Sequence, residues 1–157
     1  MGGEAGTNAS PKKRILVAED NSNDVFLLKS AFHEAAPNIE LSIFEDGTAL
    51  VHHLQSPLQE TPAPELLLLD LNIPGMDGFQ VLEWIRRQPG LREMPVVIFS
   101  SSGAAADIDQ AYELGANSYL VKPFDFRRLT EIVERMAGYW FGINRSPDCR
   151  VEQPLRR

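Results

Sequence analysis

The sequence predicts an α/β fold, a doubly wound five-stranded parallel sheet with helices on both faces. Short continuous apolar runs, such as residues 15–18 and 66–69, are typical of strands that are buried on both faces. Segments with helical periodicity stand between these runs, and parallel strands need such crossovers. The length of 157 residues suits one domain, and 43% hydrophobic residues are enough for a core.

The first half of the chain alternates strand and helix. Strands are expected at residues 15–18 and 39–44, and helices at residues 21–35 and 46–55. The first helix is indicated by apolar residues at helical spacing with a proline beyond them: Val25, Leu28, Phe32 and Pro37. Residues 56–64 contain three prolines and are therefore expected to form a loop.

The second half continues the same alternation. The third strand, residues 66–69, ends at Asp70, and further elements follow as strands 95–99 and 118–121 and helices 79–88 and 104–114. Gly115 stands where the helix over 104–114 needs a left-handed cap. The last helix is indicated by an apolar stripe made of Leu129, Ile132, Val133, Met136 and Trp140.

The ends of the chain differ from this pattern. Residues 1–12 lack periodicity and are expected to form a disordered leader, whereas residues 13–138 form the folded domain. Residues 139–157 form a C-terminal extension that is too short to be an output domain. Three aromatic residues, Tyr139, Trp140 and Phe141, begin this extension, and they pack either on the domain's own core or on a second copy of the chain.

Composition excludes several classes of function. The net charge is −7, with 15 basic against 22 acidic residues, which argues against nucleic acid as the main partner. No apolar run is long enough to span a membrane, and no signal peptide is recognisable, so we expect a cytoplasmic protein. The single cysteine cannot form an internal disulfide.

Chemically active side chains follow the predicted strands. Because the carboxyl ends of parallel strands meet at one edge of a sheet, five side chains are expected to converge there: Glu19, Asp20, Asp70, Ser100 and Lys122. Two charges about 4 Å apart repel by about 4 kcal/mol at an effective dielectric near 20. Clustered carboxylates therefore need a cation, and oxygen ligands suit Mg²⁺. A single acid after a strand is more often a helix cap, but five such side chains together favour a site.

Four ordered motifs carry a family resemblance. They are ILVAED at residues 15–20, LDLNIPGMDG at 69–78, PVVIFS at 95–100 and YLVKPF at 119–124. With these motifs the chain over residues 13–138 resembles a response-regulator receiver domain of two-component signalling, which implies a flavodoxin-like fold. It is similar to the stand-alone type that is paired with bacterial phytochrome-like histidine kinases.

The resemblance implies a role for each motif residue. A partner histidine kinase phosphorylates Asp70, and the protein assists this reaction and its reversal without otherwise being an enzyme. Mg²⁺ is held by Glu19, Asp20, Asp70 and the backbone carbonyl of Asn72. Lys122 and Ser100 contact the phosphoryl group, and Ser100 and Tyr119 act as switch residues. The signal then passes by contact to a downstream protein, and the face made by the fourth helix, fifth strand and fifth helix is one candidate surface for a homodimer.

Other interpretations stay open at this stage. A phosphorylation-independent adaptor of the same fold would have the same sequence pattern. A phosphatase of the haloacid-dehalogenase type also uses an aspartate nucleophile, but it has a second aspartate where this chain has Asn72. A nucleotide-binding module would need glycines after the first strand, where the chain has Glu19 and Asp20 instead.

Overall fold

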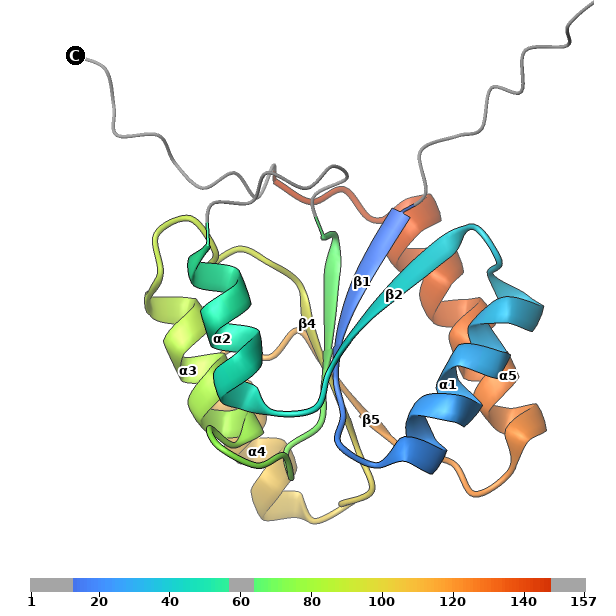
Figure 1. Ribbon diagram of the computed structural model, residues 1–157, viewed down its shortest axis with the longest axis horizontal. Helices are drawn as coiled ribbons and strands as arrows, with labels where there is room; N and C mark the ends of the chain where they lie inside the picture. The colour runs from blue at the N-terminus through green and yellow to red at the C-terminus, as the bar shows by residue number, and fades with distance from the viewer. Residues whose placement is uncertain (1–12, 57–63, 148–157) are drawn as a thin grey trace, which may run out of the picture.

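In the computed structural model, residues 13–56 and 64–147 are described. The strands form one parallel sheet in the order β2-β1-β3-β4-β5 (Figure 1). They are β1 (Lys13–Ala18), β2 (Ile39–Phe44), β3 (Leu66–Leu69), β4 (Val96–Ser100) and β5 (Ser118–Val121). The helices are α1 (Ser22–Ala35), α2 (Gly47–Gln55), α3 (Gly78–Arg87), α4 (Ala105–Glu113) and α5 (Phe126–Ala137), and α5 continues into a π-helical segment, η1 (Gly138–Ile143).

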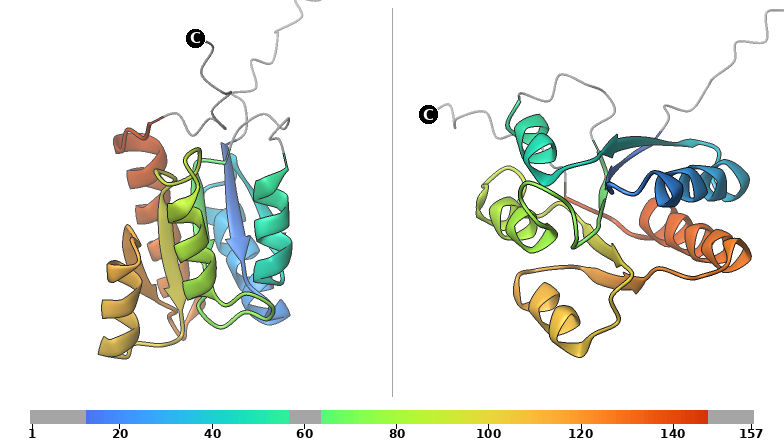
Figure 2. Two further views of the ribbon diagram at one scale, coloured as in Figure 1. Left: turned by 90° about the vertical axis from the view of Figure 1, so that its left-hand side faces the viewer. Right: turned by 60° about the horizontal axis from the view of Figure 1, so that its bottom comes forward.

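The helices cover both faces of the sheet, as the sequence predicts. Helices α1 and α5 pack side by side on one face, whereas α2, α3 and α4 lie on the other (Figures 1 and 2). The core is therefore split into two apolar layers on either side of the strands. The central strand β3 contributes to both layers, and its four leucines are at most 1% exposed.

The predicted elements are confirmed with small shifts of their ends. β1 begins at Lys13 and not at residue 15, because Lys13 and Arg14 pair in register with Ile39 and Glu40 of β2. These two residues are charged, so the apolar pattern that predicts the strand does not include them. Residues 1–12, residues 57–63 of the expected loop and residues 148–157 lie outside the described residues.

Local signals at the helix ends explain where the helices begin and stop. Asp77 begins α3 with a capping box, in which its side chain accepts from the Gln80 backbone while the Gln80 side chain accepts from Asp77 N–H. Gly115 has φ +100° after α4, which confirms the predicted left-handed cap. No helix within residues 13–56 and 64–147 is long and apolar enough to cross a membrane.

The aromatic residues after α5 pack mainly on their own domain. Trp140 and Phe141 are half-buried against the layer under α1 and α5, and Lys13 Nζ donates a hydrogen bond of 2.9 Å to the Phe141 carbonyl. Tyr139 is 48% exposed and meets Trp140 edge to face. Trp140 and Phe141 therefore pack on the domain's own core, which is the first of the two alternatives that the sequence left open.

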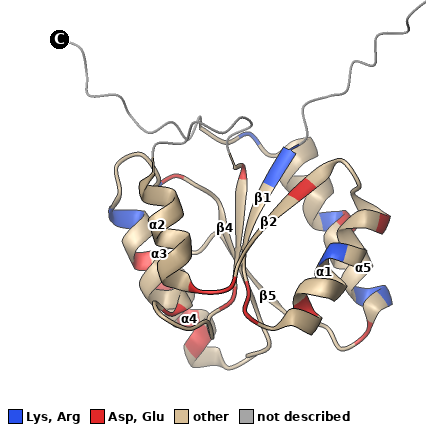
Figure 3. Cartoon of the chain, viewed as in Figure 1, with Lys and Arg blue, Asp and Glu red and all other residues tan. Residues whose placement is uncertain are grey.

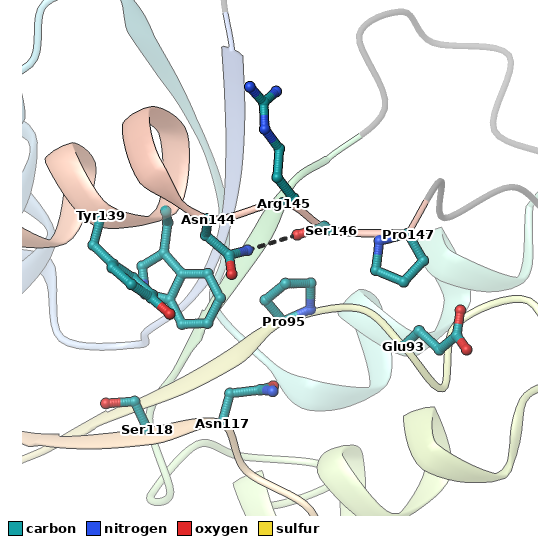
Figure 4. Close-up of a pocket in the computed structure, with 10 residues that line it drawn as sticks. Glu93, Pro95, Asn117, Ser118, Tyr139, Asn144, Arg145, Ser146 and Pro147 are labelled. Carbon is teal, nitrogen blue, oxygen red and sulfur yellow. Dashed lines mark hydrogen bonds between the residues drawn. The ribbon is translucent and has the colours of Figure 1, made fainter.

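A cavity of about 490 Å³ lies beside this segment (Figure 4). Its lining includes Pro95 just before β4, Ser118 at the start of β5, and Tyr139 and Trp140 of η1. The cavity therefore lies at the amino ends of the strands. This is the opposite edge of the sheet from the predicted acidic cluster.

Arg86 at the end of α3 connects the loop before β4 with the loop before β5. Its Nε donates to the Gly115 carbonyl at 2.9 Å, and its Nη2 donates to Asn117 Oδ1 at 2.9 Å. Its Nη1 donates to the carbonyls of Arg92 and Met94 at 2.9 and 2.8 Å. Only a planar guanidinium presents donors in these directions at once.

We expect Arg86→Lys to lower the free energy of unfolding by about 3 kcal/mol, because lysine leaves several of these carbonyls without a donor. Urea unfolding measures this change. Arg87→Lys is the matched control, since the exposed Arg87–Glu83 pair contributes within about 0.5 kcal/mol. Equal stability of the two variants would show that the Arg86 bonds do not support the fold.

Candidate functional site

Three carboxylates meet at the carboxyl edge of the sheet. Glu19 and Asp20 follow β1, Asp70 follows β3, and each offers an oxygen within 4.8 Å of the others. Glu19 and Asp70 are only 4% and 5% exposed, whereas Asp20 faces the solvent. Figure 3 shows acidic segments gathered at this edge. The predicted convergence of these three residues is therefore present in the structure.

The backbone of the sheet positions this cluster. Glu19 N–H donates to the Phe44 carbonyl at 2.9 Å, and Asp70 N–H donates to the Ala18 carbonyl at 3.0 Å. Each residue thus extends the ladder of hydrogen bonds by one step beyond its strand. β1 and β3 are neighbours because the strand order reverses there, and such a reversal opens a crevice at the carboxyl ends of an α/β sheet.

Lys122 supplies the positive charge of the site. It follows β5, and its ammonium donates to Asp70 Oδ2 at 2.8 Å and also to Glu19 Oε2. A third bond of 3.0 Å reaches Asp24 Oδ2 in the first turn of α1. The Lys122 side chain is only 11% exposed, so little water screens its pairs with the buried Glu19 and Asp70, whereas the Asp24 side chain is 39% exposed.

Asp24 is the residue that the sequence analysis missed. Its position three residues after the helix cap Asn21 is where an acid stabilises a helix through the macrodipole, and this local role explains it fully. Nothing local connects it with Lys122, which is 98 positions away. The one signal in the sequence that could have indicated a role at the site is that Asp24 lies in the first helical turn after the Glu19–Asp20 pair.

Burial and charge change the proton affinities in the cluster. Burial raises the pKa of Glu19 from 4.5 to about 7; the Lys122 and Asn21 hydrogen bonds oppose this, and the Asp70 charge reinforces it. Burial alone would lower the pKa of Lys122, but its hydrogen bonds to Asp70, Glu19 and Asp24 outweigh burial and raise the pKa above its ordinary value. Lys122 is therefore charged at any physiological pH.

The remaining predicted residues lie at the end of β4, within β5 and in the loop after β3. Ser100 ends β4 and is fully buried, and its Oγ accepts from Ser102 N–H at 3.2 Å. Tyr119 in β5 is half-buried, and its hydroxyl donates to the Ser102 carbonyl at 2.7 Å. Asn72 N–H donates to Asp70 Oδ1 at 3.2 Å, which holds the Asp70 carboxylate from the loop side.

The donor set fits a hard divalent cation. All three acidic side chains offer oxygen, and the exposed Asp20 leaves a side open to water, which such ions retain as ligands. The two buried carboxylates share the Lys122 ammonium and still lie beside the third acid. The edge of the sheet is therefore a site for a divalent metal next to a fixed ammonium.

The Glu19 pKa predicts how stability depends on pH in metal-free protein. Between pH 4.5 and about 7 the folded state holds a proton on Glu19 that the unfolded state has released, so this contribution to stability decreases as pH rises through that window. We expect the stability of the wild type relative to Glu19→Gln to fall from pH 5 to pH 8, with a slope of at most about one proton. Urea unfolding in EDTA measures it, and a constant difference would contradict the raised pKa.

Comparison with known proteins agrees with the family resemblance seen in the sequence motifs. Residues 15–134 match the family model of the response regulator receiver domain. The chain is 38% identical over 136 residues to the probable methanogenesis regulatory protein FilR2 of Methanothrix harundinacea, covering 85% of this chain and 86% of that protein. It is 35% identical over 134 residues to the response regulator Rcp1 of a Synechocystis species, covering 84% of this chain and 91% of Rcp1.

Solved structures agree with this. The phosphorylated cyanobacterial phytochrome response regulator RcpA superposes with a TM-score of 0.79 at 32% identity, covering 87% of this chain and 99% of RcpA. The Mn²⁺-bound form of Rcp1 superposes with a TM-score of 0.75 at 34% identity, covering 86% of this chain and 99% of Rcp1. The sheet order, the acidic cluster and these matches lead to one conclusion: the chain belongs to the response regulator receiver domains of two-component signalling, and it is a signalling protein rather than an enzyme.

Proposed function

We propose that Asp70 accepts a phosphoryl group from a partner histidine kinase in the presence of Mg²⁺, and that the resulting change is relayed by protein contact. The observation that carries this proposal is the pairing of the Asp70 carboxylate with the buried Lys122 ammonium beside Glu19 and Asp20. A carboxylate beside an ammonium and a bound Mg²⁺ is suited to attack a phosphoryl group, because these two positive charges would neutralise the charge on the transferring phosphoryl oxygens.

The proposed transfer moves a phosphoryl group from a histidine nitrogen to an Asp70 oxygen. An Asp70 oxygen attacks the phosphorus of a phosphohistidine, so that an O–P bond forms while the N–P bond breaks and the imidazole nitrogen leaves with its electron pair. Glu19, Asp20, Asp70 and the carbonyl of Asn72 would hold the Mg²⁺, which would supply Lewis-acid charge to the phosphoryl oxygens. Lys122 stays beside Asp70 and pairs with the product's charge.

Ser100 and Tyr119 are the proposed readout of this change. The Ser100 hydroxyl donates to the bound phosphoryl group, and Tyr119 responds through the loop that both residues contact at Ser102. The phosphoryl group carries a charge of about −1.5 to −2 in place of the −1 of the free carboxylate, and this change biases the face formed by α4, β5 and α5. This face carries exposed Tyr112 and Val121, and it serves for a downstream protein or a second copy of the chain.

Acetyl phosphate with Mg²⁺ followed by intact mass measurement tests the proposal. The wild type is expected to gain the mass of one phosphoryl group, EDTA is expected to prevent the gain, and Asp70→Asn is expected to show none. Asp109→Asn, an exposed acid of α4, is the matched control and should be labelled like the wild type. Absence of labelling in a folded protein that binds Mg²⁺ would favour the phosphorylation-independent adaptor.

A further inference from the structure

The start of α4 is held by a side chain from outside the helix. Ala104 occupies the cap position and contributes no side-chain hydrogen bond. Two residues earlier, Ser102 Oγ accepts from Ala104 N–H at 3.3 Å and donates to Asp107 Oδ2 at 2.5 Å. Ser102 and Asp107 together thus replace the missing cap, with the charge of Asp107 in the favourable first turn.

The backbone of the same residue reaches two strands. Ser102 N–H donates to Ser100 Oγ at 3.2 Å at the end of β4, and the Ser102 carbonyl accepts from the Tyr119 hydroxyl of β5 at 2.7 Å. Four hydrogen bonds therefore meet at Ser102. They join the end of β4, the middle of β5 and the first turn of α4 across one short loop.

This arrangement orients the Ser100 hydroxyl. Its oxygen already accepts from Ser102 N–H, so its own hydrogen remains available for donation. The position of that oxygen depends on where the loop holds Ser102. The neighbours of Ser102 in the loop, Ser101 and Gly103, are exposed, so the bonds of Ser102 itself determine its place.

We propose that Ser102, anchored by Asp107, is a positioning residue that sets the Ser100 hydroxyl for the phosphoryl group on Asp70 and couples that site to the start of α4. The inference rests on the proposed function. A donor held in place before the reaction stabilises developing charge better than one that must reorganise. Asp107 therefore affects the chemistry from the helix, through the Ser102 hydroxyl and without touching the reacting atoms.

The test measures the rate of labelling by acetyl phosphate at saturating Mg²⁺. We expect Ser102→Ala and Asp107→Ala each to slow labelling by about fivefold. This factor corresponds to about 1 kcal/mol, the usual contribution of a helix cap. The double variant should be no slower than the slower single variant, because both changes break one link. Ser102→Thr keeps the hydroxyl and should restore the wild-type rate within about twofold.

Matched controls separate positioning from a general loss of structure. Ser101→Ala and Asp109→Ala remove exposed side chains of the same loop and helix and should label at the wild-type rate. The dissociation constant of Mg²⁺ should be unchanged in Ser102→Ala and Asp107→Ala, since neither residue belongs to the carboxylate cluster. Weakened Mg²⁺ binding in step with slower labelling would indicate disruption of the site and overturn the proposal.

The outcomes also separate this inference from the function on which it rests. If the wild type takes up no phosphoryl group, the proposed function fails and the inference fails with it. If the wild type is labelled and the Asp107→Ala rate equals the Asp109→Ala rate, only the inference fails. Should Ser102→Ala not fold, the comparison of these two aspartate variants still decides.

Discussion

Lys122→Met should both destabilise the metal-free protein and slow phosphoryl uptake by at least about 100-fold. The ammonium of Lys122 pairs with the buried carboxylates of Glu19 and Asp70 and with Asp24. Methionine fills a similar volume but leaves these charges facing one another without a cation. Removing one member of a buried ionic group costs about 3 kcal/mol or more. Chemical unfolding at pH 8 in EDTA measures this loss. Removing Lys122 also raises the Glu19 pKa further, because the Lys122 interactions lower it in the wild type, so proton uptake by Glu19 offsets part of the repulsion in the variant.

Addition of Mg²⁺ distinguishes electrostatics from packing in this variant. The ion takes over part of the role of the missing ammonium, so it should bind Lys122→Met more tightly than the wild type and raise its melting temperature by more. Lys29→Met is the matched control: Lys29 is exposed on α1, and the variant should differ from the wild type by less than about 0.5 kcal/mol. A Lys122→Met protein as stable as the wild type in EDTA would contradict the proposed balance of charges.

Gly78→Ala is the second substitution for which we expect a large loss of stability, because the added Cβ would clash with the backbone of Asp70. A Cβ at Gly78 would lie 2.4 Å from the Asp70 carbonyl oxygen and 2.6 Å from Leu71 Cα. The contact is with main chain, which cannot rotate away as a side chain does. We expect a loss of about 3 kcal/mol in the free energy of unfolding and a slower labelling of Asp70.

Gly138→Ala gives the matched control for this substitution. Gly138 lies in the helical segment after α5, and a Cβ there would meet nothing within 4 Å. Alanine at a compatible helical position should leave stability unchanged or increase it by up to about 1 kcal/mol. Thermal unfolding and the labelling rate of the two variants are compared directly. Wild-type behaviour of Gly78→Ala would mean that the turn after β3 is free to shift without moving Asp70.

Much of the architecture was predictable because it depends on local patterns. All four side chains of β3 are leucines, and such an uninterrupted apolar run predicts a strand with helices on both faces of its sheet. β3 is buried on both faces in the structure. The acids after β1 and β3 were predicted to converge for a related reason. Parallel strands begin and end in step, so residues one step beyond them share an edge of the sheet.

Contacts between distant side chains were not predictable in this way. The pairing of Asp24 with Lys122 needs α1 and the end of β5 to approach each other, which depends on the strand order and on helix packing. Asp107 reads as an ordinary acid in the first turn of a helix, and only the loop geometry shows that it holds Ser102.

The same division applies to the whole molecule. Residue order alone determined the sequence of elements, the buried strands and the types of side chain at their ends, because periodicity and capping act within a few residues. Three-dimensional packing decided which cation faces which acid, that Trp140 and Phe141 cover their own core, and which residue holds the start of α4. These depend on the free energy of long-range contacts, which no short stretch of chain encodes.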